Sequence, residues 1–191
     1  MKRIIWGAGI TLTAVVVIAA AVCQGTAASA SRAAAARVER GNYLVSTIGC
    51  HDCHTPKKFG PNGPEIDTTR LLSGHPEGTE MPAPPASSQA WMMIASADLT
   101  AFSGPWGISY AMNLTPDQNT GIGIWTEDMF LSALKTGRHM GVSRPILPPM
   151  PWTAFRNLSD EDLKAIFAYL RSIPPVHNRI PDPVPPAGAA N

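Results

Sequence analysis

Residues 49–56 read Gly-Cys-His-Asp-Cys-His-Thr-Pro, so Cys50 and Cys53 stand three positions apart and His54 directly follows the second. Several kinds of site use such a cysteine pair. A structural zinc site needs four ligands, yet the only other cysteine is Cys23 and the remaining histidines are scattered singly. A thioredoxin-like dithiol needs a strand that leads into a helix, whereas a helical pattern precedes this pair. A plain disulfide stays open, but it would leave His54 without a role.

Covalent attachment of haem gives all three side chains a role. Two thiols at this spacing bond to the two vinyl groups of the porphyrin, and the histidine that follows ligates the iron. The sequence therefore predicts one haem c, attached through Cys50 and Cys53, with His54 as the proximal ligand. The two residues between the cysteines, His51 and Asp52, are assigned no ligand role.

The second axial ligand is predicted to be Met150. It stands in the segment Arg-Pro-Ile-Leu-Pro-Pro-Met-Pro-Trp-Thr-Ala-Phe, with prolines on both sides. Proline restricts the backbone, so this thioether can be positioned with little further loss of conformational entropy. Methionine is a common partner of histidine on haem iron. Met140 and His139 are the alternatives.

Three segments have the pattern of helices. Residues 31–48 contain strong helix formers, and a second helix is expected from a Thr126 cap to Gly137. A third follows Ser159 and ends before two prolines. The residues expected to face the core are Phe130, Ala133 and Leu134 in the second helix, and Leu163, Ile166, Phe167 and Leu170 in the third.

Long loops connect these helices. Residues 55–90 and the tail after Ile173 are rich in proline, and no segment has a convincing strand pattern. Gly41 interrupts the first helix, which usually means that another helix crosses closely. We therefore expect a mainly α domain, with three or more helices and long loops wrapped around one covalently bound haem that supplies its apolar centre.

The N-terminal segment predicts export. Lys2 and Arg3 precede an uncharged stretch, and Ala28-Ser29-Ala30 has the small residues that a signal peptidase recognises. We expect a signal peptide over residues 1–30, a cytochrome domain over 31–175 and a proline-rich tail over 176–191. An uncleaved anchor is the alternative, because residues 4–22 are long enough to span a bilayer. In either case the expected location is the periplasm, with possible attachment to the membrane.

The charge of the chain is nearly balanced. Fifteen lysines and arginines stand against 14 aspartates and glutamates, for a net charge of +1. The sequence has no basic stripe, so nucleic acid is not an expected partner.

Four segments resemble class I c-type cytochromes, and more narrowly the cytochrome c subunits and small soluble cytochromes linked to bacterial membrane-bound dehydrogenases. They occur in the order that this family has them, and the subunits of the large complexes often carry three haem domains whereas this chain has one motif. The segments are RGNYLVSTIGCHDCHTP, NLTPDQNTGIGIWTEDMFLSALKTG, PILPPMPW and LSDEDLKAIFAYLRSIPPV.

The resemblance implies a cytochrome c-like fold with Met150 as the distal ligand. It implies that the first and last helices cross, with Gly41 and Tyr43 meeting Phe167 and Tyr169. It also implies that a proline carbonyl soon after the motif accepts the free N–H of His54, which makes Pro61 or Pro64 the candidate. Residues that could cover the haem or bond its propionates are Trp106, Tyr110, Asn113, Trp125 and Trp152.

The expected function is that of a monohaem, one-electron carrier and not an enzyme, although the carrier could be the cytochrome subunit of a dehydrogenase. Its partners would be redox proteins, such as a dehydrogenase, an oxidase or another cytochrome. The alternative is a haem-based sensor or a peroxidase-like enzyme with a displaceable sixth ligand. His139 beside Arg138 is the pair that would suit that alternative.

Overall fold

The structure is a computed structural model that describes residues 9–84 and 91–186, with side chains described from residue 26 onward. The chain divides into two units. The first, up to Arg37, consists in its described part of the helix α1, which spans Gly9–Thr47 and continues into the second unit. The second unit begins at Val38 and holds all the other elements.

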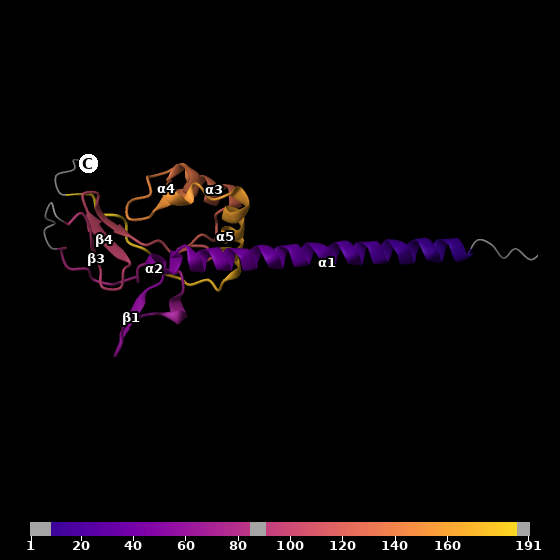
Figure 1. Cartoon of the computed structure of the whole chain (residues 1–191), viewed down its shortest axis with the longest axis horizontal. Helices are drawn as coiled ribbons and strands as arrows, with labels where there is room; N and C mark the ends of the chain where they lie inside the picture. The colour runs from indigo at the N-terminus through magenta and orange to yellow at the C-terminus, as the bar shows by residue number, and fades with distance from the viewer. Residues whose placement is uncertain (1–8, 85–90, 187–191) are drawn as a thin grey trace, which may run out of the picture. The chain divides into compact units, whose positions relative to one another are not determined.

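The two helices predicted from capping signals are confirmed. Helix α3 spans Glu127–Thr136, where the Thr126 hydroxyl accepts from the backbone N–H of Met129 and Gly137 ends the helix in a left-handed conformation. Helix α5 spans Asp160–Ser172, and its Ser159 cap accepts from the N–H of Asp162. All the residues expected to face the core on these two helices are buried. In Figure 1 these helices lie together with the short helix α4, Trp152–Phe155.

Gly41 lies where α1 meets α5, as its position in the sequence predicts. A β-carbon added to Gly41 would stand 1.9 Å from the carbonyl oxygen of Ala165 and 2.7 Å from the β-carbon of Tyr169. Close by, the guanidinium of Arg40 donates to the carboxylate of Asp162 at 2.9 Å. Tyr43 is exposed, and Phe167 packs its ring on Phe130. The glycine therefore allows the two backbones to approach.

A Gly41→Ala variant is expected to lower the free energy of unfolding by about 1–3 kcal/mol, the usual cost of overpacking a close contact. At an open helical position the same change would stabilise by about 0.5–1 kcal/mol, so the sign of the effect tests the crossing. Denaturant unfolding measures it, with Ser46→Ala on the exposed side of the same helix as the control. Stabilisation by Gly41→Ala would contradict the close approach.

The structure contains short strands, although no segment of the sequence has a convincing strand pattern. One antiparallel hairpin joins β1, Lys57–Gly60, to β2, Gly63–Ile66. A second sheet has the order β3-β4-β5 and is antiparallel, with β3 at Ile94–Ala95, β4 at Ala101–Gly104 and β5 at Gly107–Tyr110. The strands have only two to four residues, too few for a periodic pattern in the sequence. On β5 the buried positions are Gly107 and Ser109, so the usual apolar alternation is absent.

The long loops are packed against the domain. Asn178, in the C-terminal segment, is buried and donates to the carbonyls of Ser73 at 2.6 Å and His75 at 2.8 Å. Farther along, Val184 exchanges backbone hydrogen bonds of 2.8 and 3.0 Å with Ile108 of β5. The remaining elements are α2, Cys50–His54, and the 3-10 turns η1, Thr68–Arg70, and η2, His139–Gly141.

The buried core joins α1, α3 and α5. It consists of Leu44, Val45, Leu72, Ile122, Phe130, Leu134, Leu163, Ile166, Phe167 and Leu170. The predicted mainly α, cytochrome-like fold class is confirmed, with the two small sheets as additions to it.

Candidate haem site

The cysteine–histidine run forms its own short helix, α2. Positions three and four apart share one side of a helix, so Cys50, Cys53 and His54 are directed together. The Lys57 ammonium donates to the backbone carbonyls of His51 and Asp52, which lie in this helix. The lysine thereby satisfies carbonyls that a single helical turn leaves without intrahelical partners.

The two thiols are free and do not form a disulfide. Burial raises the pKa of the Cys50 thiol to about 11, and burial also raises the pKa of Cys53. Reactive dithiols and zinc ligands need the thiolate, which a low pKa favours. Within the described residues, no group of three or more histidine, cysteine or acidic side chains could hold a metal ion. Burial therefore favours the neutral thiol at both cysteines.

His54 is buried and oriented by a residue far along the chain. Its Nδ1 lies 2.7 Å from the carbonyl oxygen of Met112, which can only accept, so Nδ1 carries the proton. Burial lowers the pKa of His54, which favours the neutral ring with a lone pair on Nε2. The proposal that Pro61 or Pro64 accepts this bond was wrong. Both prolines belong to the exposed β1–β2 hairpin, and a loop 58 residues away supplies the acceptor instead.

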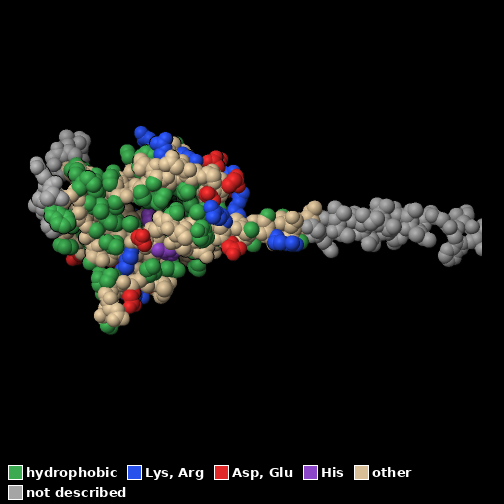
Figure 2. Space-filling view, in the orientation of Figure 1, with side chains coloured by type: hydrophobic (Ala, Val, Ile, Leu, Met, Phe, Trp, Pro, Cys, Tyr) green, Lys and Arg blue, Asp and Glu red, His purple; other side chains and the backbone are tan. Residues whose placement is uncertain are grey.

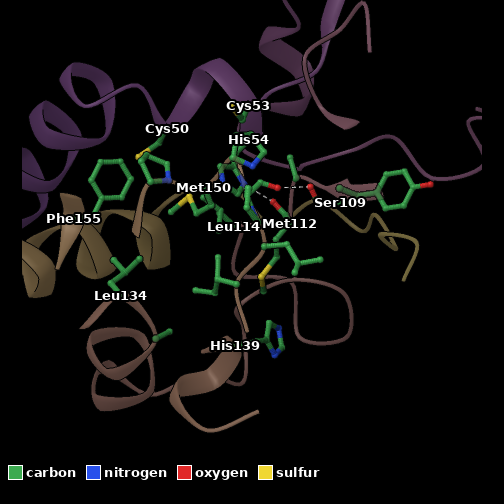
Figure 3. Close-up of a pocket in the computed structure, with 18 of the residues that line it drawn as sticks. Cys50, Cys53, His54, Ser109, Met112, Leu114, Leu134, His139, Met150 and Phe155 are labelled. Carbon is green, nitrogen blue, oxygen red and sulfur yellow. Dashed lines mark hydrogen bonds between the residues drawn. The ribbon is translucent and has the colours of Figure 1, made fainter. Parts of the chain in front are cut away.

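The three motif residues form part of the wall of a cavity of about 380 Å³. Met150 lines the same cavity, and in Figure 3 both Met150 and His54 are drawn among the side chains that surround it. Most of the wall is apolar, including Phe102, Ile122, Phe130, Leu134, Ile166 and Leu170. Two thiols, an imidazole and a thioether around an apolar cavity are the groups that a covalently held haem requires, so these residues fit it.

The alternative distal ligands are placed differently. Met140 is not among the residues that line the cavity. His139 does line it, but its ring packs edge-on against Trp125 at 5.2 Å and its Nδ1 lies 3.3 Å from the Ser143 hydroxyl. Arg138 is absent from the cavity wall and donates to the Ser143 carbonyl, whereas Arg144 lines it. The His139–Arg138 pair is therefore not brought together at the cavity.

Several lining residues were missed by sequence reasoning. Met112 contributes both its side chain to the wall and its carbonyl to His54. Ser109 also lines the cavity, from a strand that no pattern indicates. Of the aromatic candidates, Tyr110 and Trp125 line it. The other candidates have separate contacts: Asn113 binds the Val176 carbonyl, Trp106 binds Ser109, and Trp152 covers Gly137.

Several curated proteins are similar to this chain, and three of them are cytochrome subunits of dehydrogenases from three different species. The cytochrome subunit of a fructose dehydrogenase from Gluconobacter japonicus is 31% identical over 147 residues, which cover 77% of this chain and 23% of that protein. The cytochrome c subunit of a quinone alcohol dehydrogenase from Gluconobacter oxydans is 29% identical, over 82% of this chain and 26% of that protein. The cytochrome c subunit of a gluconate 2-dehydrogenase from Pantoea cypripedii is 31% identical over 145 residues, which are 74% of this chain and 24% of that protein.

The chain thus spans about a quarter of the length of these curated relatives. No family model matches it. The similarity to cytochrome c subunits of dehydrogenases supports the resemblance drawn from the four sequence segments.

Proposed function

Because this chain is a relative of the cytochrome c subunits of membrane-bound dehydrogenases, we propose that it is an electron-transfer protein with one covalent haem c. Cys50 and Cys53 would carry the haem, with His54 and Met150 as the axial ligands. The single observation that carries this proposal is the meeting of these four side chains at one apolar cavity. Met150 comes from a loop 96 positions beyond His54, so sequence proximity does not account for it.

When bound, the haem would supply an iron centre that alternates between the ferrous and ferric states. The protein side chains would keep both axial positions filled. The Met112 carbonyl fixes the His54 ring so that Nε2 is its free nitrogen. The Met150 thioether is a neutral, soft donor and would raise the reduction potential. Apolar walls exclude water, which also favours the less charged ferrous state.

We propose that the chain works in the periplasm as a one-electron carrier of a respiratory or dehydrogenase-linked chain. The export signal predicted for residues 1–30 supports this location, although residues 1–8 lie outside the described residues. The residues described do not include a helix that is long and apolar enough to cross a membrane. In this proposal residues 31–175 are the cytochrome domain and 176–191 the tail. Its partners would be redox proteins such as a dehydrogenase, an oxidase or another cytochrome.

Ferrous protein at neutral pH is expected to react slowly or not at all with carbon monoxide, because Met150 would fill the sixth position. Peroxide turnover should be negligible, while electron exchange with an electrode stays fast. In the view of Figure 2 charges of both signs are interspersed, so this exchange should depend only weakly on salt.

Stopped-flow spectroscopy and protein-film voltammetry measure these rates. Fast carbon monoxide binding together with turnover of peroxide would instead indicate the haem sensor or peroxidase-like enzyme. In that case His139 and Arg144, which both line the cavity, would be the first residues to replace.

A further inference from the structure

The loop that carries Met150 makes few backbone hydrogen bonds. Ile146 donates to the Gly137 carbonyl at 2.8 Å, and Trp152 donates to Met150 itself at 2.9 Å. Between these two points, Pro148, Pro149 and Pro151 have no N–H to give. A hydrogen bond from a side chain elsewhere in the domain can therefore help to fix residues 148–151.

Ser109 of β5 supplies that contact. Its hydroxyl donates to the carbonyl oxygen of Pro148 at 2.5 Å, two residues before Met150. The indole N–H of Trp106 donates to the same Ser109 oxygen at 3.2 Å, so the hydroxyl hydrogen is directed to Pro148. Ser109 is buried at 7% exposure, where a hydroxyl without a hydrogen-bond partner is costly, whereas Pro148 itself is exposed. Figure 3 shows the Ser109 bond and the strand from which it comes.

The strand that holds Ser109 is itself fixed on both sides. Phe102 of β4 pairs with Ser109, and on the other side Ile108 pairs with Val184 of the C-terminal segment. Gly107 has a φ of 92°, and a β-carbon there would stand 2.0 Å from the Val184 carbonyl oxygen. The hydroxyl therefore projects from a well-supported strand and not from a free loop.

We propose that Ser109, directed by Trp106, is a positioning residue that holds the Pro148–Met150 segment so that the thioether stays toward the haem iron. The sheet β3-β4-β5 then has a function, as a brace for the distal ligand. This inference rests on the proposed function, since it requires that Met150 ligates the iron.

The test uses the holoprotein with Ser109→Ala, Ser109→Thr and Trp106→Phe. In Ser109→Ala the carbon monoxide association rate of ferrous protein should rise about threefold to tenfold, the factor expected when one net hydrogen bond is lost. The weak red absorption band of ferric iron–sulfur ligation should also disappear at a lower temperature than the far-ultraviolet circular dichroism signal. Ser109→Thr keeps the hydroxyl and should restore both values. Trp106→Phe keeps the Ser109 hydroxyl but removes the indole N–H that directs it to Pro148, so it should raise the rate less, by about twofold.

Ser103→Ala is the matched control, a serine on β4 that does not line the haem cavity. The proposed role of Ser109 is refuted if Ser109→Ala binds carbon monoxide at the wild-type rate while the wild type itself shows the red band. A wild type without the red band would refute Met150 ligation, a different failure. If Ser109→Ala does not accumulate, Trp106→Phe decides: an unchanged rate refutes the brace, and a rise of about twofold or more supports it.

Discussion

A double Cys50→Ala, Cys53→Ala variant is expected to hold no covalent haem and to fail to accumulate as folded protein. The cavity of about 380 Å³ would then have nothing attached to fill it. The apolar side chains that line the cavity would then face water in place of haem, and they would lose that hydrophobic contact. An ordinary domain is stable by only about 5–15 kcal/mol, so this loss is expected to leave little folded protein.

Haem staining after denaturing electrophoresis and the yield of soluble exported protein measure this effect. Ser46→Ala, on the exposed side of the preceding helix and outside the motif, is the control and should retain its haem. The wild-type haem should resist extraction by acid and organic solvent. If all the haem can be extracted from the wild type, covalent attachment is refuted.

Replacing Met150 with alanine is expected to keep the covalent haem and to abolish the red iron–sulfur band. The reduction potential should fall by about 0.1 V or more, within the range of about 0.8 V that axial ligands span. Carbon monoxide should then bind rapidly, because the sixth position is no longer protected by an internal ligand. Ferric absorption spectra and a redox titration measure these changes.

Met140→Ala is the control for this prediction, since Met140 lies in the same region of the chain but outside the cavity wall. It should change neither the band nor the potential. If Met140→Ala loses the band and Met150→Ala keeps it, the ligand assignment is reversed. If neither variant loses it, Met112 is the next methionine to replace, because it is the other methionine that lines the cavity.

The helices could be predicted because their signals are local. Thr126 and Ser159 each cap a helix through an N–H three residues on, and the apolar faces repeat at helical spacing. The close contact at Gly41 was also predicted correctly, because a glycine inside a helix indicates that another backbone approaches closely. The helix caps and apolar faces depend on residues within one or two turns of each other. Which helix crosses at Gly41 does not follow from such local signals.

The sheets and the partner of His54 could not be predicted because they depend on distant residues. Ser109 is buried where an apolar residue would be expected, and its partner at Pro148 lies 39 positions away. Met112 acts on His54 through its carbonyl, which every residue has, so no side-chain type identifies it. For the candidate site, the sequence was sufficient to name the four haem-binding residues, which stay predictions, but not the residues that would orient them.

The pairing of Val184 with Ile108 also bears on how this protein avoids aggregation. An exposed strand edge with free N–H and C=O groups can recruit a strand from another molecule. Along the β5 edge, Val184 occupies the pairing position, and its neighbours Pro183 and Pro185 have no N–H to offer an incoming strand. The opposite edge, β3, is only two residues long. Both edges of the β3-β4-β5 sheet are thus poor templates for a strand from another molecule.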